Sequence, residues 1–331
     1  MPQMTLSAAR AWTAAIFERA GASAVAAQST ARALVAAEAD GLKGHGFARI
    51  STYAAMLKSG KVRGSAVPVL RQTRPGALIV DAACGFAYPA IDLACEALPQ
   101  MARTNGVAIA GITRSGHAGA IGHHVERLAE HGLVVLFFAN TPAAISPWGG
   151  KKAVFGTNPL AFAAPLPGRP PLVIDMAVST VARATVLAAK QAGQPIPEGW
   201  ALDADGRPTT DAAAGLAGTM APLGGAKGAA LALMVEVLGA ALVGSQLSFD
   251  ATSFLDAEGE PPETGQCMIA IDPAGLGHGG FGAAMTRLAT EIEAQSGARL
   301  PGARRLAARA AAVDSGVEVT EALAQEFGTM G

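Results

Sequence analysis

The residues best suited to chemistry lie in the glycine-rich stretch 40–49, where His45 sits between Gly44 and Gly46 and Arg49 follows four residues later. An imidazole can donate or accept a proton near neutral pH, and a guanidinium can bind a carboxylate through two parallel hydrogen bonds. If a helix begins near Gly46, side chains four residues apart project to one side of its N-terminal end. The pair therefore suits a substrate that carries a carboxylate beside a carbonyl, hydroxyl or imine, although a capping histidine and a surface arginine would have the same spacing.

Two glycine-rich turns could bring backbone N–H groups close to the phosphates of a nucleotide. One spans residues 115–122, between an expected strand and an expected helix, and the other spans 224–228 and holds Lys227. The second turn is not a P-loop, because Ala226 stands where a P-loop has glycine and no Ser or Thr follows Lys227. The glycines of 277–282 have the spacing of a Rossmann fingerprint, but too little chain follows them for a mononucleotide-binding half.

Neither the histidines nor the cysteines predict a metal site or a disulfide framework. His123 and His124 are adjacent and would face apart on a helix, whereas two metal ligands on one helix face need a spacing of three or four. The three cysteines, Cys84, Cys95 and Cys267, are odd in number and have no CxxC spacing. We therefore expect no metal, and we expect three reduced thiols that serve as packing residues.

Composition restricts the class of protein further. The 331 residues are 50% hydrophobic and 15% charged, which is enough apolar material for a large core and excludes a disordered chain. No apolar run reaches the roughly 18 residues of a membrane span, and no basic segment followed by an apolar run opens the chain. A formal net charge of −1 gives no indication of a nucleic-acid partner. We expect a cytoplasmic homo-oligomer without a membrane or nucleic-acid partner.

The elements that must position these side chains form an α+β pattern. Hydrophobic periodicity and capping residues predict helices over 5–19, 23–39, 47–57, 87–104, 121–130, 179–191, 228–243, 281–295 and 303–313. Short apolar runs predict strands over 67–72, 77–81, 107–113, 133–140, 159–165, 172–175 and 267–271, with a loop over 193–211. Strands outnumber helices between 133 and 174, which favours a central mixed or antiparallel sheet over βαβ alternation. We expect a helical cap (1–66 with 296–331), a sheet domain (67–177 with 265–295) and a smaller helical domain (178–264).

Taken in order, these stretches resemble the malate/L-lactate dehydrogenase family that does not use a Rossmann fold. Its relatives include sulfolactate, ureidoglycolate and diketogulonate oxidoreductases, and reductases of Δ1-piperideine-2-carboxylate and Δ1-pyrroline-2-carboxylate. The resemblance covers nearly the whole chain, in the stretches 40–49, 115–122, 147–150, 155–159, 174–177, 196–200, 222–228 and 300–302.

The resemblance implies an extended NAD(P)H on an unusual nucleotide-binding sheet, and a homodimer whose helical cap takes part in dimerisation. The family's proton donor falls on His45, its carboxylate-binding arginine on Arg49, and a substrate contact on Thr157. The implied cofactor contacts fall on His117, Ala118, Gly119, Ala120, Ile121, Asp175, Met176, Ala177, Ala226, Lys227, Gly302, Arg304 and Arg305.

Two positions depart from the family pattern. Members of the imino-acid reductase branch have a serine before the histidine and a later aspartate that orient the ring, and Gly44 and Thr185 stand in those places here. Thr185 therefore enters the expected catalytic set as a hydroxyl, which can hydrogen-bond an imidazole but cannot stabilise an imidazolium as a carboxylate does. Asp40 is a candidate replacement acid, because it lies close in sequence. Arg183 is a candidate second carboxylate clamp, although an exposed helix arginine would look the same.

The residues leave the choice between NAD and NADP open, and we favour NADP. Arg304 and Arg305 could hold a ribose 2′-phosphate through charge-assisted hydrogen bonds. An Asp175 that faced the ribose hydroxyls would instead repel that phosphate.

We therefore expect an NAD(P)-dependent oxidoreductase that interconverts a small 2-oxo carboxylate and its 2-hydroxy acid. One alternative is a reductase of a cyclic 2-imino acid such as Δ1-piperideine-2-carboxylate or Δ1-pyrroline-2-carboxylate, because a protonated imine needs less from a general acid. Another is a non-catalytic NAD(P)-binding dimer that kept the fold after it lost the orienting pair.

Overall fold

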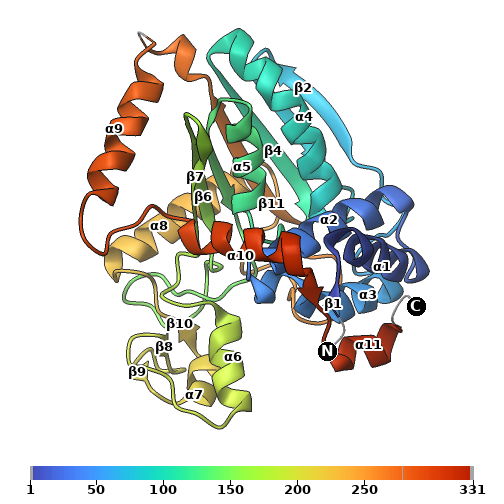
Figure 1. Ribbon diagram of the computed structural model, residues 1–331. Coiled ribbons are helices and arrows are strands. Elements are labelled where there is room, and N and C mark those ends of the chain that lie inside the picture. The colour runs from blue at the N-terminus through green and yellow to red at the C-terminus, as the bar shows by residue number, and fades with distance from the viewer. Residues whose placement is uncertain (1–2, 278, 329–331) are drawn as a thin grey trace.

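A seven-stranded mixed sheet forms the centre of the computed structural model, which describes residues 3–277 and 279–328 (Figure 1). The strands lie in the order β2-β3-β4-β11-β5-β6-β7; β3 and β4 are parallel, and the other neighbours are antiparallel. Their bounds are β2 (Val69–Arg74), β3 (Ala77–Asp81), β4 (Val107–Ser115), β5 (Val134–Ala139), β6 (Leu160–Leu166), β7 (Arg169–Met176) and β11 (Thr264–Ile271). The predicted α+β class with a central mixed sheet is confirmed.

Helices cover both faces of this sheet, and the strand residues alternate accordingly. On β11, Met268 and Ala270 pack toward α4 (Ala87–Asn105) and α5 (Gly122–Glu130). The alternate residues Cys267 and Ile269 belong to the core on the other face, where α8 (Ala226–Glu236) and the π-helical turn η3 (Val237–Ala241) lie. Because helices cover both faces of the sheet, the central strands are nearly continuous apolar runs in the sequence.

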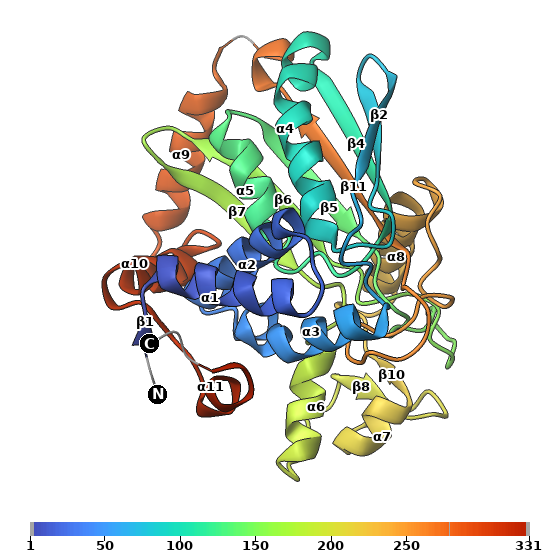
Figure 2. The same cartoon turned by 90° about the vertical axis from the view of Figure 1, so that its right-hand side faces the viewer.

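A separate helical layer packs beside the sheet and carries the His45 stretch (Figure 2). It consists of α1 (Leu6–Arg19), α2 (Ala24–Ala39) and α3 (Ile50–Ser59), with α10 (Ala303–Ser315) and α11 (Glu321–Phe327) from the C-terminal end. The side chains of Thr5 and Ser23 cap α1 and α2, as their positions predict. The short strands β1 (Gln3–Met4) and β12 (Val317–Glu318) pair antiparallel and join the two ends of the chain.

The remaining residues form a small unit that shares a core with the α8 side of the sheet. It holds α6 (Arg183–Gln191), α7 (Ala212–Ala217) and a three-stranded sheet of β10 (Thr219–Met220), β8 (Ala201–Leu202) and β9 (Pro208–Thr209). The predicted loop over 193–211 thus contains two short strands, too short to show a periodicity. The helix predicted from 179 begins at Arg183, because Ser179 and Thr180 pair with the segment at Pro222 instead.

Two further predictions need correction in detail. The single helix predicted over 228–243 is α8 followed by η3, so its regular α-helical part ends at Glu236. The glycines of 277–282 follow the 3-10 turn η4 (Pro273–Gly275) and precede α9 (Phe281–Glu293), and His278 among them lies outside the described residues. No helix within the described parts of the chain has the length and apolar character needed to cross a membrane.

Candidate active site

His45 lies in a tight double turn directly after α2. The turn consists of the 3-10 helices η1 (Lys43–His45) and η2 (Phe47–Arg49), after which α3 begins at Ile50. The Arg49 Nε atom donates a hydrogen bond to the Gly44 carbonyl oxygen at 2.8 Å, which draws the arginine back over the turn. The sequence prediction that His45 and Arg49 lie together agrees with this geometry, although the predicted α-helix begins only after Arg49.

His45 belongs to a cluster of aromatic rings that is centred on His117. Its ring stacks on that of His117, with centroids 5.3 Å apart and planes 15° apart. The His117 Nδ1 atom lies 2.6 Å from the Tyr53 hydroxyl, which itself lies 3.2 Å from the hydroxyl of Tyr88. The ring of Phe254 packs against His117 at a centroid distance of 5.3 Å. His117 thus joins the predicted site as a side chain, and not only through the backbone of its turn.

The electrostatics of this cluster favour uncharged rings. Burial, followed by the charges of Arg49 and His123, lowers the pKa of His45 to about 4. Burial and the charge of Arg49 also lower the pKa of His117 well below its usual value. Burial raises the pKa of Tyr53, so its phenol stays protonated. At neutral pH the cluster therefore consists of neutral imidazoles and phenols beside one guanidinium.

The two nitrogens of the His45 ring are not equivalent. Nδ1 is buried and has no hydrogen-bond partner within the described chain. Nε2 is not among the buried nitrogens without a partner, which leaves it as the ring nitrogen open to a ligand. No carboxylate orients this ring through Nδ1, in agreement with the departure that the sequence shows at Gly44.

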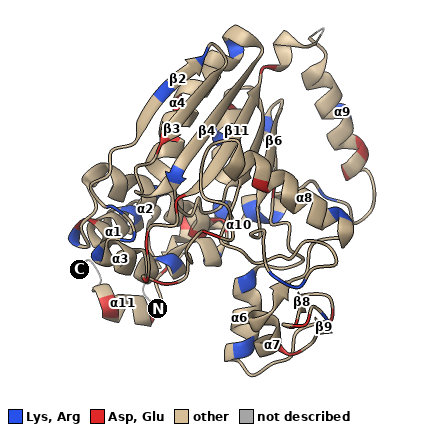
Figure 3. Ribbon diagram, turned by 180° about the vertical axis from the view of Figure 1, so that it is seen from behind, with Lys and Arg blue, Asp and Glu red and all other residues tan. Residues whose placement is uncertain are grey.

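Asp40 does not supply the missing carboxylate, and that prediction is wrong. Its oxygens lie 2.8 Å from His123 Nε2, 2.7 Å from Arg309 Nε and 3.1 Å from Arg305 Nη1. Burial raises the pKa of Asp40, but hydrogen bonds from Arg309 and His123 outweigh it and hold that pKa well below its usual range. Glu126 completes this ionic cluster by binding both arginines, and acidic and basic segments meet near α10 and α2 (Figure 3).

Thr185, Arg183 and Thr157 lie on other elements. Thr185 is exposed in the first turn of α6, and its side chain makes no hydrogen bond within the described chain. Arg183, also exposed, donates to the Leu216 carbonyl oxygen at 3.3 Å. Thr157 is half-buried, with its hydroxyl 3.3 Å from that of Thr141. None of the three contacts the His45 ring in this chain.

The turn that holds His117 to Ile121 connects β4 to α5 and has little room for side chains. Gly119 has a φ of 68°, and a Cβ there would lie 2.6 Å from the Tyr88 hydroxyl. Asp175, at the end of β7, accepts a hydrogen bond from the Gly122 N–H at 2.7 Å. A protein carboxylate therefore occupies the start of α5, where a Rossmann domain would place a phosphate.

The second turn fits an anion better. Gly224 and Gly225 have φ values of 67° and 68°, and a Cβ on Gly228 would lie 1.9 Å from the Leu223 carbonyl oxygen. Lys227 is exposed at the beginning of α8 and forms no ion pair within the described residues. Glycine backbone and a cation at a helix start are a combination suited to phosphate.

The two arginines predicted to hold a 2′-phosphate differ in their surroundings. Arg304 is exposed, and its side chain makes no hydrogen bond within the described residues. The guanidinium of Arg305 is buried among Asp40 and Glu126, at 3.1 Å and 2.7 Å. Of the two, Arg304 is the one whose charge is not already compensated.

Three ring residues of the cluster at His45, namely Tyr53, Tyr88 and Phe254, escaped the sequence analysis. Tyr53 lies four residues after Arg49, so helical spacing was an available signal. Tyr88 gave no such signal, because it lies on α4 and reaches the cluster only through tertiary packing. Phe254 comes from a distant loop, and no local pattern indicates it.

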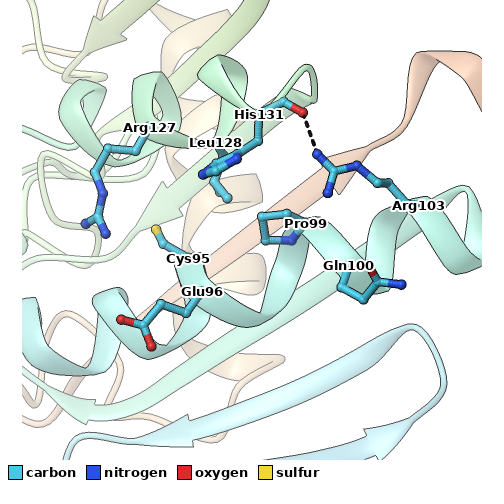
Figure 4. Close-up of a pocket in the computed structure, with 8 residues that line it drawn as sticks. All are labelled: Cys95, Glu96, Pro99, Gln100, Arg103, Arg127, Leu128 and His131. Atoms are coloured by element: carbon cyan, nitrogen blue, oxygen red, sulfur yellow. Dashed lines mark hydrogen bonds between the residues drawn. The ribbon is translucent and has the colours of Figure 1, made fainter.

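The described cavities lie away from the His45 ring. One of about 390 Å³ lies between α4 and α5 and is lined by Cys95, Glu96, Arg103, Arg127 and His131, among others (Figure 4). Another, of about 340 Å³, borders the ionic cluster at Asp40, His123 and Arg309. Within residues 3–277 and 279–328, no group of three or more His, Cys, Asp or Glu side chains is placed to hold a metal ion.

Comparisons with known proteins agree with the fold. The family model for malate/L-lactate dehydrogenase matches residues 4–327. The chain is 47% identical to a (2R)-3-sulfolactate dehydrogenase (NADP(+)) of Chromohalobacter salexigens, over 98% of this chain and 96% of that protein. It is 40% identical to a Δ1-pyrroline-2-carboxylate/Δ1-piperideine-2-carboxylate reductase of Pseudomonas aeruginosa, over 99% and 98%.

A solved structure extends this similarity to three dimensions. The Δ1-piperideine-2-carboxylate reductase from Pseudomonas syringae pvar. tomato superposes with a TM-score of 0.94 at 36% identity, covering 99% of both chains. A full-length match to the family model and relatives well above 30% identity leave one conclusion. The chain belongs to the malate/L-lactate dehydrogenase family of oxidoreductases.

Proposed function

We propose that this protein is an NADP-dependent oxidoreductase that interconverts a small 2-oxo carboxylate and its 2-hydroxy acid. The observation that carries the proposal is the juxtaposition of His45, with Nε2 as its available nitrogen, and Arg49 in one turn. The similarity to a sulfolactate dehydrogenase supports hydroxy-acid chemistry. When bound, the nicotinamide supplies or accepts the hydride.

The protein's part is to hold the carboxylate and to move one proton. Arg49 binds the carboxylate, and in the direction of reduction His45 Nε2 gives its proton to the oxygen that leaves the reaction as a hydroxyl. The charge of Arg49 lowers the pKa of His45. A carboxylate bound to Arg49 offsets that charge, so substrate binding raises the pKa of His45 and increases the fraction of imidazolium, the form that carries the proton to be transferred.

A second candidate function is the reduction of a cyclic 2-imino acid. The low pKa of His45, about 4, and the lack of an orienting carboxylate favour it, because an iminium already carries its proton. The similarity to pyrroline- and piperideine-2-carboxylate reductases supports it as well. In this reaction Arg49 still binds the carboxylate, and His45 serves to exclude water and to orient the ring.

For the cofactor, the proposal assigns a phosphate to the glycine-rich turn 224–228 and the 2′-phosphate to Arg304. The exposed Lys227 and the strained glycines before it support the first assignment, and the uncompensated charge of Arg304 supports the second. The backbone of His117, Ala118, Gly119, Ala120 and Ile121, with Asp175, Met176, Ala177, Ala226 and Gly302, completes the proposed set. Arg304→Ala is expected to weaken NADPH binding more than NADH binding, and an equal loss would contradict the assignment.

The proposal includes a homodimer. Large apolar side chains are exposed along α8 and η3, namely Leu233 (50%), Met234 (44%), Val237 (49%) and Leu242 (58%). A contiguous apolar surface of this kind is typical of an interface. The exposed Thr185 is kept as a proposed catalytic residue that a second subunit would bring into a complete site. A cytoplasmic location, supported by three buried free cysteines, also stays a proposal.

A substrate and cofactor panel tests the function. We expect reduction of pyruvate or oxaloacetate, or oxidation of (2R)-3-sulfolactate, to exceed reduction of Δ1-piperideine-2-carboxylate in kcat/KM, and NADP(H) to exceed NAD(H). A higher kcat/KM for the imine would select the second function. Binding of NADPH without turnover of any of these compounds would favour a non-catalytic binding protein instead.

A further inference from the structure

The buried carboxylate of Glu38 connects the last turn of α2 to the turn that carries His45. Its side chain is only 4% exposed. One oxygen accepts a hydrogen bond from the Phe47 backbone N–H at 2.9 Å, and the other forms an ion pair with the Lys43 ammonium. The two donors lie two residues before and two residues after His45. A single carboxylate therefore holds both sides of the turn.

The backbone between these two contacts lies directly against α2. A Cβ on Gly46 would lie 2.3 Å from Glu38 Oε2 and 3.0 Å from Glu38 Cα and backbone N. With φ −97° and ψ −131°, Gly46 lies outside the backbone regions that residues with a Cβ ordinarily adopt, so glycine is required here for conformation as well as for space. The glycine next to His45 thus lets the turn approach Glu38 closely.

We propose that Glu38 is a positioning residue for proton transfer, because its carboxylate fixes the turn that aims His45. The inference rests on the proposed function, in which His45 Nε2 exchanges a proton with the substrate. Displacement of a reacting group by about 1 Å can cost on the order of 100-fold in rate, so a device that fixes this turn acts on kcat. Within the described residues no carboxylate reaches the ring itself, so the position of the imidazole depends on its backbone turn and on the His117 ring on which it stacks.

The two contacts of Glu38 contribute unequally. The hydrogen bond to Phe47 N–H is buried, and its loss leaves a buried donor without a partner. The side chain of Lys43 is 63% exposed, so its ion pair is largely screened by water. The oxygen that accepts the hydrogen bond from Phe47 N–H is therefore the feature of Glu38 that positions His45, and the negative charge that pairs with Lys43 matters less.

Three variants separate these contributions. Glu38→Ala removes both contacts, Glu38→Gln keeps an oxygen that can accept from Phe47 N–H, and Lys43→Ala removes the ion pair alone. For each full-length variant we would measure kcat, the KM of the 2-oxo or 2-imino substrate, the Kd of NADPH by fluorescence, and the solvent deuterium isotope effect on kcat.

We expect Glu38→Ala to lower kcat by about 10- to 100-fold while the Kd of NADPH changes by less than about twofold. Its solvent isotope effect should rise, because a misaligned proton transfer becomes a larger part of the rate-limiting step. Glu38→Gln and Lys43→Ala should each keep kcat within about threefold of the parent protein. Loss of fold stability alone would lower the amount of active protein without changing the isotope effect.

A Glu38→Ala protein with the parent kcat, or a Glu38→Gln protein as impaired as Glu38→Ala, would overturn the proposal. If Glu38→Ala does not fold, Glu38→Asp replaces it, since the shorter side chain keeps the charge but withdraws the oxygen from Phe47 N–H; an unchanged kcat would again overturn the proposal. His45→Ala distinguishes a failure of the underlying function. If it keeps the parent kcat, the proton-donor role fails, whatever Glu38 does.

Discussion

Two clusters of buried polar groups begin only five residues apart, at Asp40 and at His45, and they meet the cost of burial in opposite ways. At Asp40, two carboxylates and two guanidiniums are fully charged and pair with one another, with the Asp40 side chain completely buried. At His45, stacked imidazoles and phenols are kept neutral beside a single arginine. A charge can be buried if it is paired, and a titratable group can be buried if it loses its charge.

The cluster at Asp40 supports the fold, whereas the cluster at His45 keeps a group that can react. The charges at Asp40 join α2, α5 and α10, and every one of them has its partner within the chain. The neutral rings at His45 keep an available nitrogen and a pKa that depends on the charge of Arg49. We therefore expect substitutions in the first cluster to act on stability and substitutions in the second to act on the rate of catalysis.

The largest expected effect is on turnover. His45→Ala should lower kcat by about 10²–10⁴-fold, the usual contribution of a positioned general acid, while the free energy of unfolding changes little. Steady-state kinetics with the preferred substrate and urea unfolding would be measured on the same preparation. A variant that loses stability but keeps its kcat would remove the contrast between the two clusters.

Asp40→Asn should produce the opposite result. Removing one partner of a buried ion cluster leaves uncompensated arginines, and we expect the free energy of unfolding to fall by about 3–5 kcal/mol. Asp205→Asn is the matched control, because Asp205 pairs with Arg207 on the surface at 3.5 Å, with both side chains exposed, and should cost less than about 0.5 kcal/mol. Equal losses in the two variants would show that the Asp40 cluster contributes no more than a surface pair.

Tyr53→Phe tests the hydrogen bond that holds His117 in the neutral cluster. Loss of the 2.6 Å hydrogen bond frees the His117 ring against which His45 stacks, and we expect kcat to fall by about tenfold, in line with the loss of one buried hydrogen bond. Thr30→Val is the control, since it also removes a buried hydroxyl but one without a hydrogen-bond partner. A similar kcat for both variants would show that His117 needs no anchor.

The smallest expected effect is on the pH dependence of stability, in two separate ranges. His45 has a folded-state pKa of about 4, below its usual 6.5, so its contribution is fully present above pH 6.5 and is lost as the pH falls toward 4. The pKa of Asp40 is lowered from 3.8, so its contribution is lost only below that pH. Urea unfolding from pH 7 to pH 2 should show a smaller slope in the upper range in His45→Gln, where the buried His117 and His124 still contribute, and a flatter lower range in Asp40→Asn. A single range in the parent protein would contradict the separation.

The sequence predicted the large elements of this molecule better than the small ones. Strands such as β3 and helices such as α4 are long enough for periodicity and capping to define them within a residue or two. The two-residue strands β8 and β9 have no period, and they exist only because the small unit packs together. The division of the chain into three domains stays a prediction.

The site shows the same limit. The spacing of His45 and Arg49 was enough to predict that they lie together, because both residues belong to one local turn of the backbone. The partners of Asp40 could not be read in this way, since His123 and Arg309 come from α5 and α10 and meet it only through tertiary packing. Spacing on one helix does place Arg305 and Arg309 on the same face, but it does not say which carboxylates they bind.

The pairing of β1 with β12 has a consequence for how the protein is made. Met4 pairs with Val317, and the indole N–H of Trp12 donates to the Gly328 carbonyl oxygen at 2.7 Å, so the layer that carries Glu38 and His45 is closed by residues from the far end of the chain. During synthesis, domains form in the order in which their residues leave the ribosome. The first helices can pack on one another before then, but their layer is completed only when residues 317–328 have emerged.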